Sequence, residues 1–255
     1  MNEILQRLVT AEEHGEGVCL CIVIQTNGAV PRHAGSKMLV YQDGSIFGSV
    51  GGGGVEVETL SSAKLALRDG QPRLVHYTLN IDEEGAVGIC GGEVTVYVEP
   101  QLAPTTLLIL GAGHVGRSVA KLGAVLGFRV LVADERIELC QPDFFPAGVR
   151  LIPGPISQLA EKVSINNHTF IVGVTHSSEV DISALPALLN CKPAYIGLIG
   201  SKKRWAHTRE ELSKQGMPEE QINFIKSPIG LDIKGETPDE IAVSILAEII
   251  QKKNS

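Results

Sequence analysis

The first hundred residues alternate between apolar and polar positions in a way that predicts a small sheet with helices. Apolar side chains recur at helical spacing over residues 3–14, which indicates a short amphipathic helix. Residues 18–25 (VCLCIVIQ) are an unbroken run rich in β-branched side chains, typical of a buried strand. A second helix is predicted over residues 55–68. Further strands are predicted over residues 37–41, 73–79 and 94–99.

The second half of the chain has a different pattern, in which apolar strands alternate with helices. Buried strands are predicted over residues 106–110, 129–133, 169–174 and 194–199, with a short strand beginning at Leu151. Helices are predicted over residues 115–126, 202–214 and 237–251. This alternation favours a doubly wound parallel sheet.

Residues 99–105 (EPQLAPT) separate the two patterns. The segment has two prolines and no periodicity, which is typical of a domain boundary. We therefore predict two domains, residues 1–100 and residues 101–255. The expected fold class is α/β, with a smaller N-terminal α/β domain and a Rossmann-like doubly wound C-terminal domain.

Charge and cysteine content narrow the function classes. The net charge is −7, with 22 basic and 29 acidic residues, which disfavours nucleic-acid binding. No apolar run approaches the roughly 20 residues of a membrane span, and residues 1–16 lack the apolar core of a secretory signal. The five cysteines are odd in number and form no C-x2-C pair, so neither a disulfide framework nor a zinc knuckle is indicated. A cytoplasmic location is expected.

Glycine is frequent, at 28 of 255 residues, and twelve of these glycines lie in three short clusters, residues 48–54, 85–92 and 111–116. Glycine is favoured where the backbone turns tightly or where a ligand approaches the main chain. The three clusters are therefore the first places to look for chemistry.

The third cluster follows a predicted strand and opens a predicted helix, as a G-x-G-x-x-G turn should. Gly111 permits the tight turn, Gly113 lets a pyrophosphate reach the backbone, and Gly116 lets helix and strand pack. Asp134, at the end of the next strand, is expected to hold ribose hydroxyls. His114 is either a polar residue of the helix start or a contact to a ligand phosphate or reacting group.

The first cluster places Gly51, Gly52 and Gly53 before a helix without the Gly-Lys-Ser/Thr of a P-loop. Its backbone amides suit an anion-binding nest. Glu56, in the first helical turn, either stabilises the helix dipole or contacts a ligand.

The second cluster contains Cys90, Gly91 and Gly92. Because the flanking glycines have no side chains to shield it from solvent, the Cys90 thiol is expected to be accessible. Cys19, Cys21 and Cys191 lie in or beside apolar runs and are predicted to be core residues.

Two further candidates follow predicted strands at their carboxyl ends, where doubly wound sheets bind ligands. His176 either donates to a ligand phosphate, or takes a proton, or is a loop histidine. Ser201 is a candidate helix N-cap. The following run 202–204 (KKR) is either a solvated helix face or an anion clamp.

These motifs occur with others in one order along the chain. The N-terminal half contains GAVPR (28–32) with GSKM (35–38), GSVGGG (48–53) and CGG (90–92). The C-terminal half contains GAGHVG (111–116), TH (175–176), YIGLIGS (195–201), and PIGLD (228–232) followed by ETPDEIA (236–242). In these motifs the chain resembles the XdhC/CoxI family of accessory proteins, which serve molybdenum hydroxylases such as xanthine dehydrogenase.

The resemblance implies a maturation factor with an N-terminal XdhC/CoxI domain and a C-terminal Rossmann domain. Such a protein binds the molybdenum cofactor, as molybdopterin or its dinucleotide form, keeps it for sulfuration, and passes it to the apo-enzyme of a molybdenum hydroxylase. A cysteine desulfurase or sulfurtransferase is the implied sulfur donor. The resemblance favours a cofactor chaperone over an enzyme with turnover of its own. A homodimer is expected as the commonest oligomer.

On this interpretation Cys90 is a candidate thiolate that contacts molybdenum or relays sulfur. The cofactor-binding candidates are Gly51, Gly52, Gly53, Glu56, Cys90, Gly91, Gly92, Gly111, Gly113, His114, Gly116, Asp134, His176 and Ser201. In two places the chain departs from the family pattern. Gly54 stands where a larger residue is expected, and Ser177 follows His176 where the family often has an acid.

Two alternative functions stay open. One is an NAD(P)-dependent oxidoreductase in which His114 or His176 acts as acid or base. Asp134 favours NAD over NADP, although Arg136 blurs that choice. The other is an assembly platform that binds only partner proteins.

Overall fold

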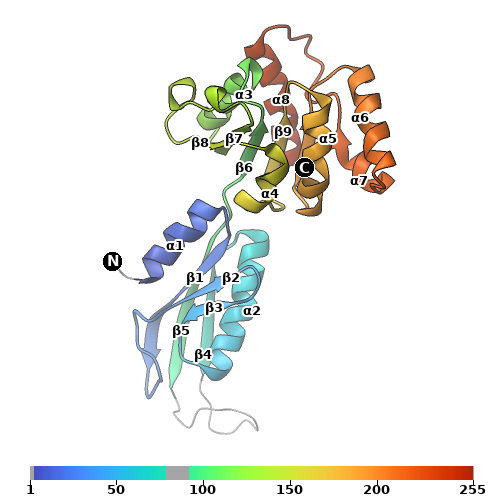
Figure 1. The fold of residues 1–255 in the computed structure, drawn as a ribbon. Coiled ribbons are helices and arrows are strands. Elements are labelled where there is room, and N and C mark those ends of the chain that lie inside the picture. The colour runs from blue at the N-terminus through green and yellow to red at the C-terminus, as the bar shows by residue number, and fades with distance from the viewer. Residues whose placement is uncertain (1–2, 79–91, 255) are drawn as a thin grey trace. The chain divides into compact units, whose positions relative to one another are not determined.

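The computed structural model describes residues 3–78 and 92–254, which form two compact units (Figure 1). Unit 1 ends at Pro104 and unit 2 begins at Thr105. This division falls inside the proline-containing segment 99–105. Among the described residues, no helix is both long and apolar enough to cross a bilayer.

Unit 1 is built on a five-stranded antiparallel sheet. Its strands are β1 (Val18–Asn27), β2 (Lys37–Tyr41), β3 (Ile46–Gly48), β4 (Arg73–Thr78) and β5 (Glu93–Gln101). They lie in the order β3-β2-β1-β5-β4, so the long central strand β1 pairs with β2 and β5. Its helices are α1 (Glu3–His14) and α2 (Gly53–Asp69).

The core of unit 1 lies between α2 and one face of the sheet (Figure 1). Alternate residues of β1 point to this face, and Cys19, Cys21 and Val23 are fully buried against α2. Helix α1 contributes Ile4 and Ala11 to a separate small cluster.

Unit 2 is a doubly wound domain around a six-stranded parallel sheet. Its strands are β6 (Thr106–Leu110), β7 (Arg129–Asp134), β8 (Arg150–Pro153), β9 (Thr169–Gly173), β10 (Tyr195–Leu198) and β11 (Ile225–Lys226). Its helices are α3 (His114–Val125), α4 (Leu159–Lys162), α5 (Ser178–Asn190), α6 (Lys202–Lys214), α7 (Glu219–Phe224) and α8 (Pro238–Lys253). Short 3-10 helices are η1 (Ile137–Leu139), η2 (Pro142–Phe144) and η3 (Ile156–Gln158).

The two faces of this sheet have separate cores. Along β6, Leu108 and Leu110 join a cluster with α4 to α7, whereas Leu107 and Ile109 join a cluster with α3 and α8. Burial on both faces explains why β6 is apolar throughout rather than alternating. The predicted α/β fold with a Rossmann-like parallel sheet is confirmed.

The strand order determines where a ligand could bind. The order β11-β10-β9-β6-β7-β8 reverses direction between β6 and β9, because the chain leaves β6 toward β7 and returns on its other side. Doubly wound sheets bind ligands outside the carboxyl ends of the strands at this switch point. The segments that follow β6, β9 and β7 therefore define the candidate site of unit 2.

The sequence patterns missed several elements. Helix α5 was not predicted, because apolar residues lie on most of its sides and Pro186 lies inside it. Helix α7, strand β11 and the 3-10 helices are too short to give a periodic signal. The short strand expected at Leu151 is present as β8.

Candidate functional site

The turn between β6 and α3 needs its glycines for different reasons. Gly111 has φ +115°, and a Cβ there would lie 2.5 Å from the Val174 carbonyl oxygen. A Cβ at Gly116 would collide with the Gly111 carbonyl oxygen. Gly113 is different, because it has an ordinary φ of −72° and no atom of the described residues within 4 Å of its Cβ position. Gly113 is therefore open toward a ligand, and no side chain in the described part of the chain caps the amides of the α3 N-terminus.

The Asp134 carboxylate holds this turn. Asp134 Oδ2 accepts hydrogen bonds from Ala112 N and Arg136 Nη2, both at 2.7 Å. Its Oδ1 accepts from Arg136 N and Nε, both at 2.9 Å. Burial alone would raise the pKa of Asp134, but the hydrogen bonds from Arg136 and Ala112 outweigh it and hold the pKa below its usual value.

His176 and His114 are both exposed at the carboxyl edge of the sheet. His176 Nε2 lies 3.8 Å from Glu135 Oε1, and both side chains are nearly half exposed. Since β6 lies between β9 and β7, this pair joins the two sides of the glycine turn. A carboxylate therefore lies near His176, but it belongs to Glu135 at a different strand end and not to the residue that follows His176.

A partly buried ion pair fixes the turn that carries His176. Arg204 Nη2 donates to Asp181 Oδ2 at 2.6 Å and to the Thr175 hydroxyl at 2.8 Å. The Thr175 hydroxyl lies 2.6 Å from Asp181 Oδ1. Burial raises the pKa of Asp181, against the opposing effects of Thr175 and Arg204. The Ser201 hydroxyl caps α6 by accepting from Arg204 N at 3.2 Å.

Of the three basic residues at the start of α6, Arg204 therefore turns inward, while Lys202 and Lys203 stay exposed. Sequence reasoning missed Arg204 and Asp181 as a positioning pair. The sequence shows only an acid at position 181, and its burial became apparent with helix α5, which the sequence pattern did not predict.

The glycine turn of unit 1 has consecutive residues in the left-handed region. Gly52 has φ +73° and Gly53 φ +52°, following Gly51 at φ +147°. Glu56 organises this turn, because its Oε1 accepts from Ser49 Oγ at 2.6 Å and from Gly52 N at 3.1 Å. The structure therefore gives Glu56 a role in shaping the loop.

Tyr77 is the residue that sequence reasoning missed in unit 1. A Cβ at Gly54 would collide with the Tyr77 hydroxyl and lie 2.7 Å from Tyr77 Cζ. The ring of Tyr77 thus occupies the space that a larger residue at position 54 would need. Tyr77 comes from β4, so nothing near Gly54 in the sequence could have shown it.

The second cluster is only partly described. Cys90 and Gly91 lie outside the described residues. Gly92 is packed closely, since a Cβ there would collide with the Ala29 carbonyl oxygen. Burial raises the pKa values of Cys19 and Cys21 to about 12, so these thiols stay protonated and unreactive at neutral pH.

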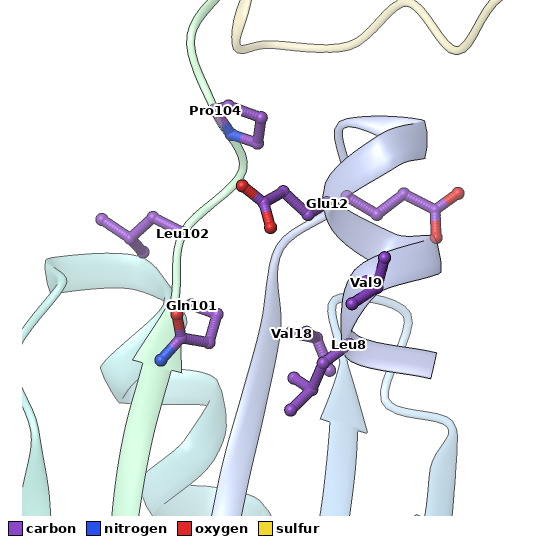
Figure 2. A pocket seen from close by; sticks show the side chains of 8 residues that line it. Leu8, Val9, Glu12, Val18, Gln101, Leu102 and Pro104 are labelled. Carbon is purple, nitrogen blue, oxygen red and sulfur yellow. The ribbon is translucent and has the colours of Figure 1, made fainter. Parts of the chain in front are cut away.

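Other features of the described chain do not coincide with the candidate residues. No group of three or more His, Cys, Asp or Glu side chains suited to a metal is found in residues 3–78 and 92–254. Figure 2 shows a pocket of about 210 Å³ in unit 1, formed by α1, the start of β1 and the chain after β5. Its lining residues are Leu8, Val9, Glu12, Glu16, Val18, Gln101, Leu102 and Pro104. None of the predicted site residues lines it.

Comparisons with known proteins bear on both units. The XdhC Rossmann domain model matches residues 107–249, and the XdhC and CoxI family model matches residues 11–78. YqeB of Escherichia coli is 35% identical over 246 residues, which cover 96% of this chain and 45% of that protein. A Bacillus subtilis protein described as a probable xanthine dehydrogenase subunit is 36% identical over 147 residues, covering 58% of this chain and 42% of that protein.

A third relative is matched over most of its length. The molybdenum cofactor insertion chaperone PaoD of E. coli is 24% identical over 296 residues, covering 96% of this chain and 86% of that protein. The chain spans less than half the length of the other two relatives.

A solved structure of a Bacillus halodurans protein described as a xanthine dehydrogenase has the same fold. It has a TM-score of 0.53 and 23% identity, and the match covers 99% of this chain and 95% of that one. With more than half of its residues matched by the Rossmann-domain model alone, the chain belongs to the XdhC and CoxI family.

Proposed function

We propose that this protein binds the molybdenum cofactor and assists its sulfuration and insertion into a molybdenum hydroxylase such as a xanthine dehydrogenase. Membership of the XdhC and CoxI family supports this role, as does the chaperone name of the relative PaoD. The protein would act as a cofactor chaperone without turnover of its own. Its partners would be the apo-hydroxylase and a cysteine desulfurase or sulfurtransferase, and we propose a cytoplasmic homodimer.

The observation that carries the proposal is the open space in front of Gly113, at the start of α3, among the described residues. The molybdenum cofactor bears a phosphate, and the uncapped amides at the start of α3 are suited to bind one. His114 and His176 stand at the same edge of the sheet and can donate to the phosphate or the pterin. Thr175, Asp181 and Arg204 would keep His176 in place.

The turn of unit 1 offers similar chemistry. Within residues 3–78 and 92–254, no side chain caps the amides after Gly52, and no atom lies within 4 Å of the Gly52 Cβ position. We propose that this turn also binds an anionic part of the cofactor. When bound, the cofactor supplies the molybdenum centre that receives sulfur.

Cys90 stays a proposed sulfur relay or molybdenum contact. As a relay, its thiolate would attack the outer sulfur of a persulfide on the partner sulfurtransferase. One S–S bond then forms as another breaks, and the partner leaves as a thiolate. A Cys90→Ala variant that matures its hydroxylase normally would rule this role out.

The proposal is tested by cofactor retention. Protein purified from cells that make the cofactor is analysed for molybdenum and for pterin, in wild type and in Gly113→Val. Because Gly113 has an ordinary φ and free space at Cβ, the variant should fold normally yet block the phosphate. Lys121→Val, at an exposed position two turns further along α3, is the matched control. Retention by wild type and control but not by Gly113→Val is expected; no retention by wild type contradicts the proposal.

NAD(P)-dependent oxidoreduction is a second candidate, favoured only by the G-x-G-x-x-G turn. It would use His114 or His176 as acid or base. Saturable NADH binding with turnover would support it.

A further inference from the structure

Asp134 stands where a dinucleotide-binding sheet reads the ribose hydroxyls of NAD. An ionised carboxylate has about four lone-pair positions for hydrogen bonds. Four N–H donors already point at this one, two to each oxygen, at 2.7 to 2.9 Å. The Asp134 side chain is only 2% exposed. A ribose diol that approached it would find neither a free lone pair nor open surface.

Arg136 accounts for three of those four hydrogen bonds. Its side chain folds back over the carboxylate in a two-pronged contact through Nε and Nη2, and its backbone amide adds a third bond. The Arg136 side chain is 34% exposed, so it forms the surface that a ligand would meet. The fourth donor, Ala112 N, belongs to the glycine turn itself.

The charge around Arg136 argues against a phosphate at this position. Asp134 neutralises the guanidinium directly, and two further carboxylates, Glu135 and Glu138, are exposed beside it. Residues 134–138 therefore carry a net charge of −2, from three acids and one arginine. A ribose 2′-phosphate would enter a negative field.

We propose that Arg136 is a specificity-determining residue that closes Asp134 to free ribose diols and so keeps NAD(H) out of the Rossmann turn. Asp134 then stabilises the glycine turn through its hydrogen bond from Ala112 N and does not bind a nucleotide. The amides of the turn remain able to bind the phosphate of a ligand that places no ribose at the end of β7. The identity of that ligand rests on the proposed function, but the exclusion of NAD(H) is tested independently of it.

The experiment tests whether removing the Arg136 side chain increases the affinity for NAD⁺. NAD⁺, NADP⁺ and ADP-ribose are titrated calorimetrically into wild type, Arg136→Gln, Arg136→Lys and the double variant Arg136→Gln/Asp134→Asn. Hydrogen bonds to a freed carboxylate should raise NAD⁺ affinity about 10- to 100-fold in Arg136→Gln. Arg136→Lys should gain less than Arg136→Gln, because lysine keeps a positive charge beside Asp134 even though it cannot make the two-pronged contact. The double variant should lose the gain.

Controls separate this effect from misfolding. Arg209→Gln removes another arginine of unit 2 from an ion pair, with Glu219, and should leave NAD⁺ affinity unchanged. Thermal unfolding of each variant shows whether the fold is retained. If Arg136→Gln is unstable, the NAD⁺ affinity of Arg136→Lys, which keeps the charge, tests the inference instead.

Three results would overturn the inference. One is saturable NAD⁺ binding by wild type at an affinity equal to that of Arg136→Gln. The second is an Arg136→Gln protein that folds but gains no affinity. The third is tight, Arg136-dependent binding of NADP⁺, which would make Arg136 a phosphate-binding residue. Molybdenum and pterin retention is measured separately, so a failed cofactor proposal and a failed exclusion give different results.

Discussion

The glycine turns of the two units are held by carboxylates in different ways. In unit 2, Asp134 reaches the turn from a neighbouring strand, 22 residues away from Ala112, and is buried beneath Arg136. In unit 1, Glu56 reaches back only four residues to Gly52 from the first turn of the same helix, and stays half-buried. One turn is therefore part of the tertiary core, whereas the other is a local structure. The two should respond differently to perturbation.

The largest effect is expected at Gly116. A Cβ at this position collides with the Gly111 carbonyl oxygen, so Gly116→Val forces α3 away from β6. Overpacking of this kind should lower the free energy of unfolding by about 3 kcal/mol. Denaturant unfolding measures it, with Gly113→Val as the matched control because a Cβ at Gly113 meets no described atom within 4 Å. If both variants are equally stable, the close approach of turn and helix is not a constraint on the fold.

Removing the Asp134 charge should have the next largest effect. Asp134→Asn weakens the contacts to Arg136 and Ala112 together, and we expect a loss of about 2 kcal/mol, since Arg136 is partly solvated. The folded pKa of Asp134 is lowered, so its stabilisation is present at neutral pH and is lost as the pH falls through that folded pKa.

Asp181 should show the opposite sign. Burial raises its folded pKa above the usual 3.8, so protonation stabilises the fold as the pH falls through the folded pKa toward the unfolded value. Urea unfolding of wild type, Asp134→Asn and Asp181→Asn between about pH 3 and pH 7 separates the two contributions. Parallel pH dependences of the two variants relative to wild type would contradict the assignment.

The contrast also explains which features could be predicted from sequence. The segment from β6 through Gly111 to α3 was predictable because strand, turn and helix are contiguous in the sequence. The need for glycine at each turn position follows from the turn itself. The long-range contacts of the site were not predictable, because Asp134 meets Ala112 across 22 residues and Arg204 meets Thr175, beside His176, across 29 residues. Asp134 was recognised as a site residue, but only its contacts show that its lone pairs are occupied. Tyr77 at Gly54 was hidden for the same reason.

The smallest effect is expected at Glu56. Glu56→Ala removes the acceptor of Ser49 Oγ and Gly52 N, and we expect a loss of about 1 kcal/mol, because both donors can turn to water. Hydrogen exchange should accelerate at the Gly52 amide while the core strands of unit 1 keep their protection, as expected for a local opening. Glu58→Ala, an exposed neighbour on α2, is the control. A loss as large as that of Asp134→Asn, with exchange accelerated throughout β1, would show that this turn too belongs to the core, and the contrast between the units would fail.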